Sequence, residues 1–294
     1  MKIVFFNGGL ANQVFQYIFY RYGQIHRPGE QWILDDSAFF GEKVHNGYEL
    51  EKVFGLHPAL LSRTFDQDVW DYMLQMKKEQ NKSIPQILLD NGSDIKMVVE
   101  NINWNEWNPF NGIVLGTNTG KVEPSITEFD DDIYYHGYWI AAGWYRLIED
   151  VLREDLKFPE IKEPSNLEYL NKIKDTVSCS IHIRRGDYVK LGISAQDKLY
   201  VDWIGTMLEK HPDLTLFVFS DDIGYCKTHM KELGLDLPRE TVFVEGNAGE
   251  SAFRDLQLMS HCKNMINVNS AFCYLAALLN KNLDTLISPP NRQL

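Results

Sequence analysis

Residues 176–189 read TVSCSIHIRRGDYV, a short β-branched run followed at once by charged side chains. The run is typical of a buried strand, and Arg184, Arg185 and Asp187 crowd its end. Guanidinium groups are planar, always charged and able to hold two oxygens at once, so an arginine pair suits a pyrophosphate. An ion pair of either arginine with Asp187 is the structural alternative. Because ligands of open α/β sheets bind outside the carboxyl ends of the strands, this stretch is a candidate anion site.

Polar side chains also stand at the ends of two later apolar runs. They are Ser220, Asp221 and Asp222 after LTLFVF, and Asn267, Asn269 and Ser270 at the end of NMINV and just beyond it. The carboxyl ends of parallel strands meet at one edge of a sheet, so three such clusters are expected to converge on one crevice.

The residue types suggest a role for each cluster. Adjacent carboxylates in a strand point to opposite faces, so for Asp221 and Asp222 a contact of one with a ribose or base edge is favoured over a metal pair. Asn269 and Ser270 stand where a strand becomes a helix, which suits both phosphate binding and an ordinary N-cap. For His182, inside the strand, a core role and a role in the anion site remain equally open.

A glycine turn follows the first apolar run of the chain. Gly8 and Gly9 separate a predicted strand at 2–6 from a predicted helix at 10–26. Free backbone N–H groups at a helix N-terminus favour an anion such as phosphate, and a purely structural turn is the alternative. The segment is neither GxGxxG nor a P-loop.

The second half alternates between apolar runs and amphipathic segments, which predicts α/β architecture with a parallel sheet and crossover helices. The predicted helices are 198–210, 223–233, 251–260 with Ser251 as its cap, and 270–281; the predicted strands are 214–219, 241–244 and 264–268, with residues 287–294 extended. A proline-marked polar stretch near residue 160 suggests two domains, 1–160 and 161–294. In the first, a helix after His136 is expected to carry Trp144, Leu147, Ile148 and Leu152 on one face, and residues 130–132 are expected to form a solvated turn.

Composition excludes several classes of protein. The 294 residues carry a formal net charge of −12, which disfavours overall attraction to nucleic acid or an anionic membrane. The N-terminal apolar run is too short for a secretory signal or a spanning helix, so a cytoplasmic location is expected, with peripheral association at the inner face of the membrane left open. Cys179, Cys226, Cys262 and Cys273 show no CxxC spacing, which indicates buried reduced thiols.

Four segments resemble the bacterial α-1,2-fucosyltransferases of glycosyltransferase family 11. They are GGLANQVFQY at 8–17, HIRRGDY at 182–188, FSDD at 219–222 and LMSHCKNMINVNSAF at 258–272. The resemblance implies a GT-B-like fold of two Rossmann-like domains facing a cleft. It also implies an acceptor-side N-terminal domain, a C-terminal domain that binds GDP-β-L-fucose, and no essential metal or cofactor.

The resemblance also implies roles for individual residues. Arg184 corresponds to an essential arginine that binds the β-phosphate of the donor. The other positions implied at the donor site are His182, Arg185, Ser220, one of Asp221 and Asp222, Asn269 and Ser270, with Gly8, Gly9, Asn12 and Gln13 facing it from the other domain. Asp187 is a candidate for the catalytic base. The chain departs from the family pattern at Ile140, Asn264, Tyr274 and Leu275, which puts the acceptor and the donor packing in question.

The expected reaction is inverting transfer of L-fucose to the 2-hydroxyl of a terminal β-galactose, without a metal. A related glycosyltransferase with another nucleotide-sugar donor and a non-catalytic nucleotide-sugar-binding protein are the alternatives. No nucleic acid partner is expected, and the sequence does not predict an oligomeric state.

Overall fold

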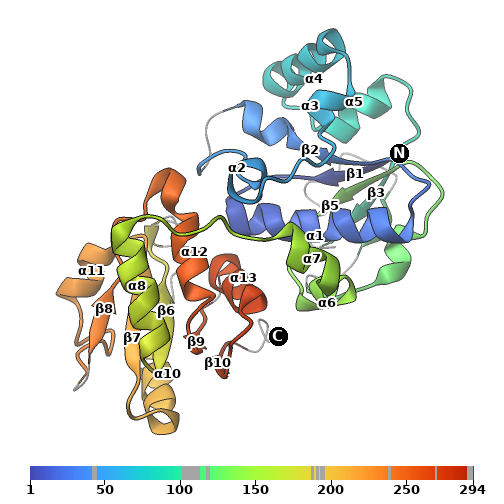
Figure 1. Cartoon of the computed structure of the whole chain (residues 1–294). Coiled ribbons are helices and arrows are strands. Elements are labelled where there is room, and N and C mark those ends of the chain that lie inside the picture. The colour runs from blue at the N-terminus through green and yellow to red at the C-terminus, as the bar shows by residue number, and fades with distance from the viewer. Residues whose placement is uncertain are drawn as a thin grey trace. The chain divides into compact units, whose positions relative to one another are not determined.

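Two units, each built on a five-stranded parallel sheet, make up the chain: Met1–Lys157 and Phe158–Leu294 (Figure 1). The computed structural model describes residues 1–41, 45–100, 113–116 (backbone only), 120–186, 189, 192, 196–237, 240–268, 270–289 and 294. The division after Lys157 lies three residues before the boundary expected from the proline-marked stretch. Asp187 and Asn269 lie outside the described residues.

In the first unit the strand order is β2, β1, β5, β3, β4. Their bounds are β1 Lys2–Phe5, β2 Trp32–Asp35, β3 Lys96–Val99, β4 Ile113–Gly116 and β5 Ile133–His136. The chain runs from β1 outward to β2, yet the other neighbour of β1 is β5, so the strand order reverses between β1 and β5. Such a switch point is where ligands bind in open α/β sheets.

Helices cover both faces of this sheet (Figure 1). They are α1 Leu10–His26, α2 Leu50–Phe54, α3 Leu61–Thr64, α4 Gln67–Gln80, α5 Ile84–Asp90, α6 Ala142–Leu147 and α7 Glu149–Asp155, with the 3-10 turns η1 Asp36–Phe40 and η3 Pro124–Thr127. Successive side chains of a strand point to opposite faces of the sheet. Tyr134 of β5 therefore packs in one apolar core with Trp70 of α4, whereas Tyr135 packs edge-on against Phe19 of α1 on the other face. The first predicted helix, 10–26, is confirmed as α1.

The prediction of a single helix after His136 is wrong, because two helices, α6 and α7, lie there. The backbone of Ile148 adopts φ −137° and ψ 30°, outside the helical region, and separates α6 from α7. Trp144 and Leu152 are fully buried as expected, but Leu147 is 48% exposed because the break turns it away from the core.

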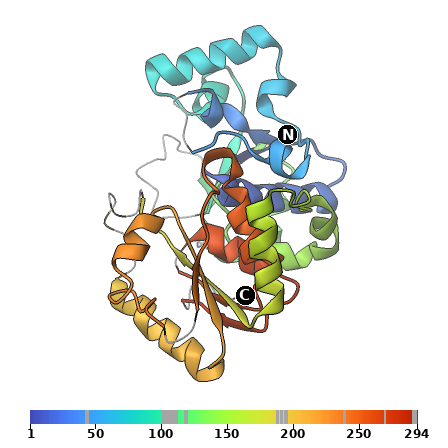
Figure 2. The same ribbon diagram turned by 60° about the vertical axis from the view of Figure 1, so that its left-hand side comes forward.

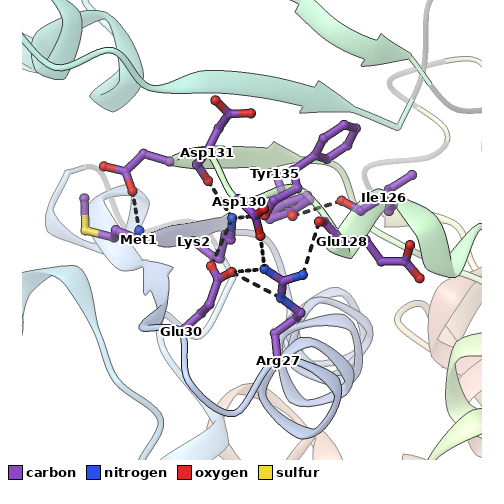
Figure 3. Close-up of polar contacts among 11 residues, drawn as sticks. Met1, Lys2, Arg27, Glu30, Ile126, Glu128, Asp130, Asp131 and Tyr135 are labelled. Carbon is purple, nitrogen blue, oxygen red and sulfur yellow. Dashed lines mark hydrogen bonds and ion pairs between the residues drawn. The ribbon is translucent and has the colours of Figure 1, made fainter.

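Three aspartates stand near the amino ends of β1 and β3, in the turn that leads into β5 (Figure 3). Asp130 pairs with Arg27 at 2.5 Å, Asp131 with Lys96 at 2.6 Å, and Asp132 with the amino group of Met1. The turn predicted at residues 130–132 is solvated, because these side chains are 93%, 44% and 40% exposed, and it also carries three ion pairs. Nearby, the fully buried ammonium group of Lys2 lies 3.0 Å from Glu30 and also donates to the carbonyls of Phe129 and Asp131.

In the second unit the strand order is β10, β9, β6, β7, β8, and every pair is parallel. Their bounds are β6 Ser178–Ile183, β7 Thr215–Ser220, β8 Thr241–Phe243, β9 Asn264–Ile266 and β10 Thr285–Ile287. The chain steps from β6 to β8 in one direction and then returns to β9 on the other side of β6, as in a Rossmann fold. This confirms the predicted parallel sheet and places its switch point between β6 and β9.

The crossover helices of this unit are α8 Pro164–Asp175, α10 Asp197–Lys210, α11 Ile223–Thr228, α12 Phe253–Met259 and α13 Ala271–Leu279, with the 3-10 turn η4 Gly249–Ser251. Figure 2 shows α10 and α11 on one side of the sheet and α8 on the other. The helix predicted at 223–233 ends at Thr228, because His229 leaves the helical conformation. Ser251 does not cap a helix: its hydroxyl donates to the Ala248 carbonyl within η4.

Two further sequence predictions concern side chains and hydropathy. All four cysteines are free and buried, as expected from their spacing. Within the described ranges, no helix has both the length and the apolar character that crossing a membrane requires.

Candidate functional site

The end of β6 carries the arginine pair, and Asp221 from the end of β7 holds it. Arg184 Nη1 lies 2.8 Å from Asp221 Oδ2, and the backbone N–H of Arg185 donates to Asp221 Oδ1 at 2.8 Å. A Cβ atom at Gly186 would lie 2.4 Å from Asp221 Oδ2, so any other residue there would displace this carboxylate. The expected convergence of these two strand ends is confirmed. An ion pair of an arginine is also present, with Asp221 as its partner.

Arg185 is fixed by an aromatic ring. Its guanidinium carbon lies 3.2 Å from the centre of the Tyr225 ring, a cation–π arrangement, and its Nε lies 3.8 Å from Asp222. Asp222 caps α11, because its Oδ1 accepts the backbone N–H of Tyr225 at 3.0 Å. The guanidinium of Arg184 thus pairs with Asp221, and that of Arg185 lies beside Asp222. In the described part of the chain, no group of three or more His, Cys, Asp or Glu is arranged to hold a metal ion.

Ser220 joins the two strand ends. Its hydroxyl donates to the Ile183 carbonyl at 2.6 Å and accepts the backbone N–H of Asp222 at 3.0 Å. The side chain thus sets the distance between the segment that carries the arginines and the segment that carries the aspartates.

His182 is buried beside the arginines. Burial, with the positive charge of Arg184, lowers the pKa of the imidazole to about 4, so the ring is neutral near pH 7. Its Nδ1 has no hydrogen-bond partner within the described residues, and its ring centre lies 5.3 Å from that of Phe272.

Asn267 is a buried polar residue of the same region. It follows Ile266, the register partner of Ile181, so it stands next to His182 at the switch point. Its amide is fully buried, and neither amide atom has a partner among the described residues. An unpaired buried amide lowers stability, which marks a place for a ligand or water. The sequence placed Asn267 in a polar cluster but did not select it as a site residue.

The N-terminus of α13 completes this edge of the sheet. Ser270 is its N-cap: the hydroxyl oxygen accepts the backbone N–H of Phe272 at 3.3 Å. The dipole and N–H groups of such a terminus favour an anion. The structure thus brings the described candidates of the second unit to the carboxyl ends of β6, β7 and β9.

The remaining candidates lie in the first unit: Gly8 and Gly9 in the loop after β1, and Asn12 and Gln13 at the start of α1. Gly8 has φ +89°, and a Cβ there would lie 2.7 Å from Asn12 Nδ2. Gln13 is buried, and its amide links the glycine turn to the segment before α2: Nε2 donates to the carbonyls of Gly8 and Gly47, both at 2.8 Å, and Oε1 accepts the N–H of Glu49 at 2.9 Å. Gln13 therefore shapes the glycine turn, and Gly9 forms the start of α1.

The turn after β5 is held by two side chains that the sequence did not single out. Gln16 of α1 contacts the Gly137 carbonyl, and Glu100, next after β3, accepts the backbone N–H groups of Tyr138 and Trp139. These bonds join residues that are 38 to 121 positions apart, so no local pattern in the sequence signals either of them.

Comparison with known proteins places the chain in a family. The model of the family described as glycosyl transferase family 11 matches residues 87–293. An alpha-1,2-colitosyltransferase of Escherichia coli is 28% identical over 96% of this chain and 89% of its own length. The O-antigen biosynthesis glycosyltransferase WbnK of Escherichia coli is 30% identical over 120 residues, 38% of each chain.

Solved structures with similar folds include fucosyltransferase NodZ from Bradyrhizobium, at 13% identity and a TM-score of 0.47 over 95% of this chain and 93% of that one. POFUT1 in complex with GDP-fucose gives 13% identity and a TM-score of 0.48 over 98% and 97%. The family model covers most of the chain, including the arginine pair, Asp221, Asp222 and the N-terminus of α13. The chain belongs to glycosyl transferase family 11.

Proposed function

We propose that this glycosyltransferase transfers L-fucose from GDP-β-L-fucose to the 2-hydroxyl of a terminal β-galactose, with inversion at the anomeric carbon. The observation that carries the proposal is the position of Arg184, at the switch point of the second sheet with its guanidinium held by Asp221. The resemblance of the HIRRGDY segment to fucosyltransferases and the family membership support the donor.

In this reaction the bond between fucose C1 and the β-phosphate oxygen breaks, and C1 bonds to the galactose 2-oxygen. Negative charge grows on the β-phosphate as GDP leaves, and a positive group already in place stabilises that charge without reorganisation. Arg184 is assigned this role. Asp221 keeps the guanidinium oriented, since one guanidinium has enough N–H groups to serve a carboxylate and a phosphate together.

The rest of the donor is assigned to neighbouring groups. Arg185 supports the pyrophosphate, with Ser270, Asn269 and the N-terminus of α13. Asp222 is assigned the guanosine contact, because its side chain is 48% exposed whereas Asp221, at 24%, is occupied by the arginines. His182 is neutral near pH 7 and is assigned a supporting role beside Arg184.

The acceptor proton needs a destination, and Asp187 remains the candidate base. The first unit is assigned to the acceptor side, and the donor-site roles of Gly8, Gly9, Asn12 and Gln13 stay predictions. The assignment of the donor to the second unit and of the acceptor to the first is part of the proposal.

A second donor is favoured by one observation. The relative that matches nearly the whole chain is a colitosyltransferase, so transfer of colitose to the same kind of acceptor is the competing function. The two donors differ in the sugar while the reaction and the role of Arg184 stay the same.

Release of GDP tests the proposal directly. We expect GDP release from GDP-fucose in the presence of lactose, unchanged by EDTA, with GDP-colitose and GDP-mannose as competing donors. Linkage analysis of the product should give a fucosyl-α-1,2-galactose. Lack of turnover with every β-galactoside would refute the acceptor, faster turnover with GDP-colitose would favour the second donor, and loss of activity in EDTA would refute metal independence. Binding of GDP without any turnover would indicate a non-catalytic protein.

A further inference from the structure

Glu100 joins the ends of two neighbouring strands in the first unit. It directly follows β3, and its backbone N–H donates to the His136 carbonyl at 2.9 Å. Its Oε2 accepts the backbone N–H of Tyr138 at 2.7 Å and that of Trp139 at 2.9 Å. The residue is only 5% exposed. One buried carboxylate oxygen thus holds two consecutive N–H groups of the turn that follows β5.

Gln16 holds the same turn from the helix side. Its Nε2 donates to the Gly137 carbonyl at 3.3 Å, and its Oε1 accepts the backbone N–H of Asn7 at 3.0 Å. Asn7 lies in the loop after β1, and Gly137 lies in the turn after β5. Because the strand order reverses between β1 and β5, this fully buried amide spans the switch point of the first sheet.

The backbone of this turn is strained and crowded. Trp139 has φ +56°, the left-handed region that non-glycine residues rarely adopt. Its ring is buried and stacks on Phe19 at 4.1 Å. A Cβ at Gly137 would lie 2.5 Å from the Cβ of Glu100, so the turn and the glutamate pack in direct contact. Such a conformation persists only where the surrounding contacts impose it.

The turn presents one aromatic side chain at the carboxyl edge of the sheet. Tyr138 is part-exposed, and its ring lies edge-on to Phe5 with 6.1 Å between ring centres. A tyrosine ring with an apolar face and a polar tip is a common contact for a sugar, which also has both kinds of surface.

We propose that Glu100 and Gln16 are positioning residues for the acceptor. They fix the turn at residues 137–139 so that Tyr138 is held at the switch point of the first sheet, where it contacts the terminal sugar of the acceptor glycan. The inference rests on the proposed function, which assigns the acceptor to this unit.

The test uses the full-length enzyme and two kinds of substitution. Glu100→Leu and Gln16→Met remove the contacts to the turn, whereas Glu100→Gln keeps a carbonyl oxygen that can accept both N–H groups. Asp36→Asn is the matched control: Asp36 is also a buried carboxylate next to a strand of this sheet, and it accepts the N–H and hydroxyl of Ser62.

Hydrogen exchange measures the positioning itself. We expect the amides of Tyr138 and Trp139 to exchange faster in Glu100→Leu than in the wild type, and to stay protected in Glu100→Gln and Asp36→Asn. Equal protection in Glu100→Leu and the wild type would overturn the inference. If Glu100→Leu does not fold, Gln16→Met serves as the test variant, with faster exchange around Gly137 as the expected result.

Kinetics then separates positioning from general stability. In Glu100→Leu and Gln16→Met we expect the KM for lactose to rise about tenfold or more, because small displacements of a binding group cost at least that much, while the KM for GDP-fucose stays within about twofold. Glu100→Gln should restore the lactose KM. A lower thermal midpoint with an unchanged lactose KM, as expected for Asp36→Asn, would overturn the inference and leave the proposed function intact. A wild-type enzyme that uses no β-galactoside would overturn both.

Discussion

Arg184 is the residue on which the proposed chemistry depends, and its neighbours explain its orientation. Asp221 reaches it from β7, Gly186 leaves room for that carboxylate, and Ser220 fixes the two strand ends together. The arginine is thus held in place before any ligand arrives. Preorganised charge of this kind is what stabilises a developing oxyanion.

Replacing Arg184 should therefore remove activity while the chain stays folded. For Arg184→Ala we expect a fall in turnover of roughly a thousandfold, the upper range for loss of one donor to a developing oxyanion. Arg184→Lys should recover little, because an ammonium group cannot bridge Asp221 and a phosphate in the same plane. Turnover of GDP-fucose and circular dichroism are the measurements.

The control for this prediction is Arg153→Ala, on α7 of the first unit, where the arginine pairs with Glu149 at the surface. It should leave turnover unchanged, since exposed ion pairs contribute little to the stability of the fold and Arg153 is assigned no contact with the donor. Normal activity of Arg184→Ala would contradict the assignment.

At this scale, residue type decided what the sequence could predict. Arg184, Asp221 and Ser270 were visible because charged or capping residues at a strand end have few structural uses. The unpaired amide of Asn267 and the turn contacts of Glu100 and Gln16 were not visible, because they depend on which backbone groups lie nearby.

At the scale of elements, the contact between α1 and β2 shows how tightly helix and sheet pack. Gly23 of α1 faces the Trp32 ring, and a Cβ there would lie 2.4 Å from two of its ring carbons. Trp32 is fully buried and stacks on Tyr135 at 5.3 Å, so the indole has little room to move. The close approach of helix and strand depends on this glycine.

Gly23→Ala should therefore destabilise the protein despite favouring the helix. Alanine gains up to about 1 kcal/mol over glycine in a helix interior, whereas overpacking a core costs roughly 1–3 kcal/mol. Chemical denaturation is expected to give a lower free energy of unfolding. Gly205 stands at an exposed position of α10, where an added Cβ would meet no atom within 4 Å outside the helix's own backbone, so Gly205→Ala should raise stability by roughly 0.5–1 kcal/mol. Equal effects of the two substitutions would contradict this account of the α1 contact.

The sequence predicted elements well where apolar runs were long and bounded by turn residues. The extents of α1 and α10 and the parallel sheet of the second unit were predicted from the sequence pattern. Strand β10 was missed as a strand because three residues, Thr285–Ile287, carry no alternation of their own and are defined by pairing with β9. The break at Ile148 likewise has no glycine or proline to signal it.

At the scale of the whole molecule, the dependence of stability on pH combines ionisable groups that act in opposite directions. Burial lowers the pKa of His182 from 6.5 to about 4, so its neutral form is favoured on folding and stability is lost as pH falls from about 6.5 to 4. Burial raises the pKa of Asp255 from 3.8 to about 7, despite a hydrogen bond from Asn247 at 2.8 Å. Its folded form binds a proton that the unfolded chain has released, so stability is lost as pH rises from about 4 to 7.

Asp255→Asn removes the loss of stability that the Asp255 carboxyl causes as pH rises. The amide keeps an oxygen for Asn247 and carries no charge, so we expect a higher thermal midpoint than the wild type at pH 8 and nearly the same midpoint at pH 3.5, measured by calorimetry. Asp202→Asn, at an exposed position of α10, is the control and should change the midpoint little at either pH. A gain for Asp255→Asn that is equal at both pH values would show that the carboxylate charge is not the cause.

The four buried thiols have a practical consequence for how the two units can be studied. Cys179, Cys226, Cys262 and Cys273 all belong to the second unit, and burial raises the pKa of the first three, so in the folded chain they are poor targets for alkylating reagents. Six of the seven tryptophans belong to the first unit. Alkylation rate therefore reports opening of the second unit and tryptophan fluorescence reports mainly on the first, so the native chain already carries a separate reporter for each half.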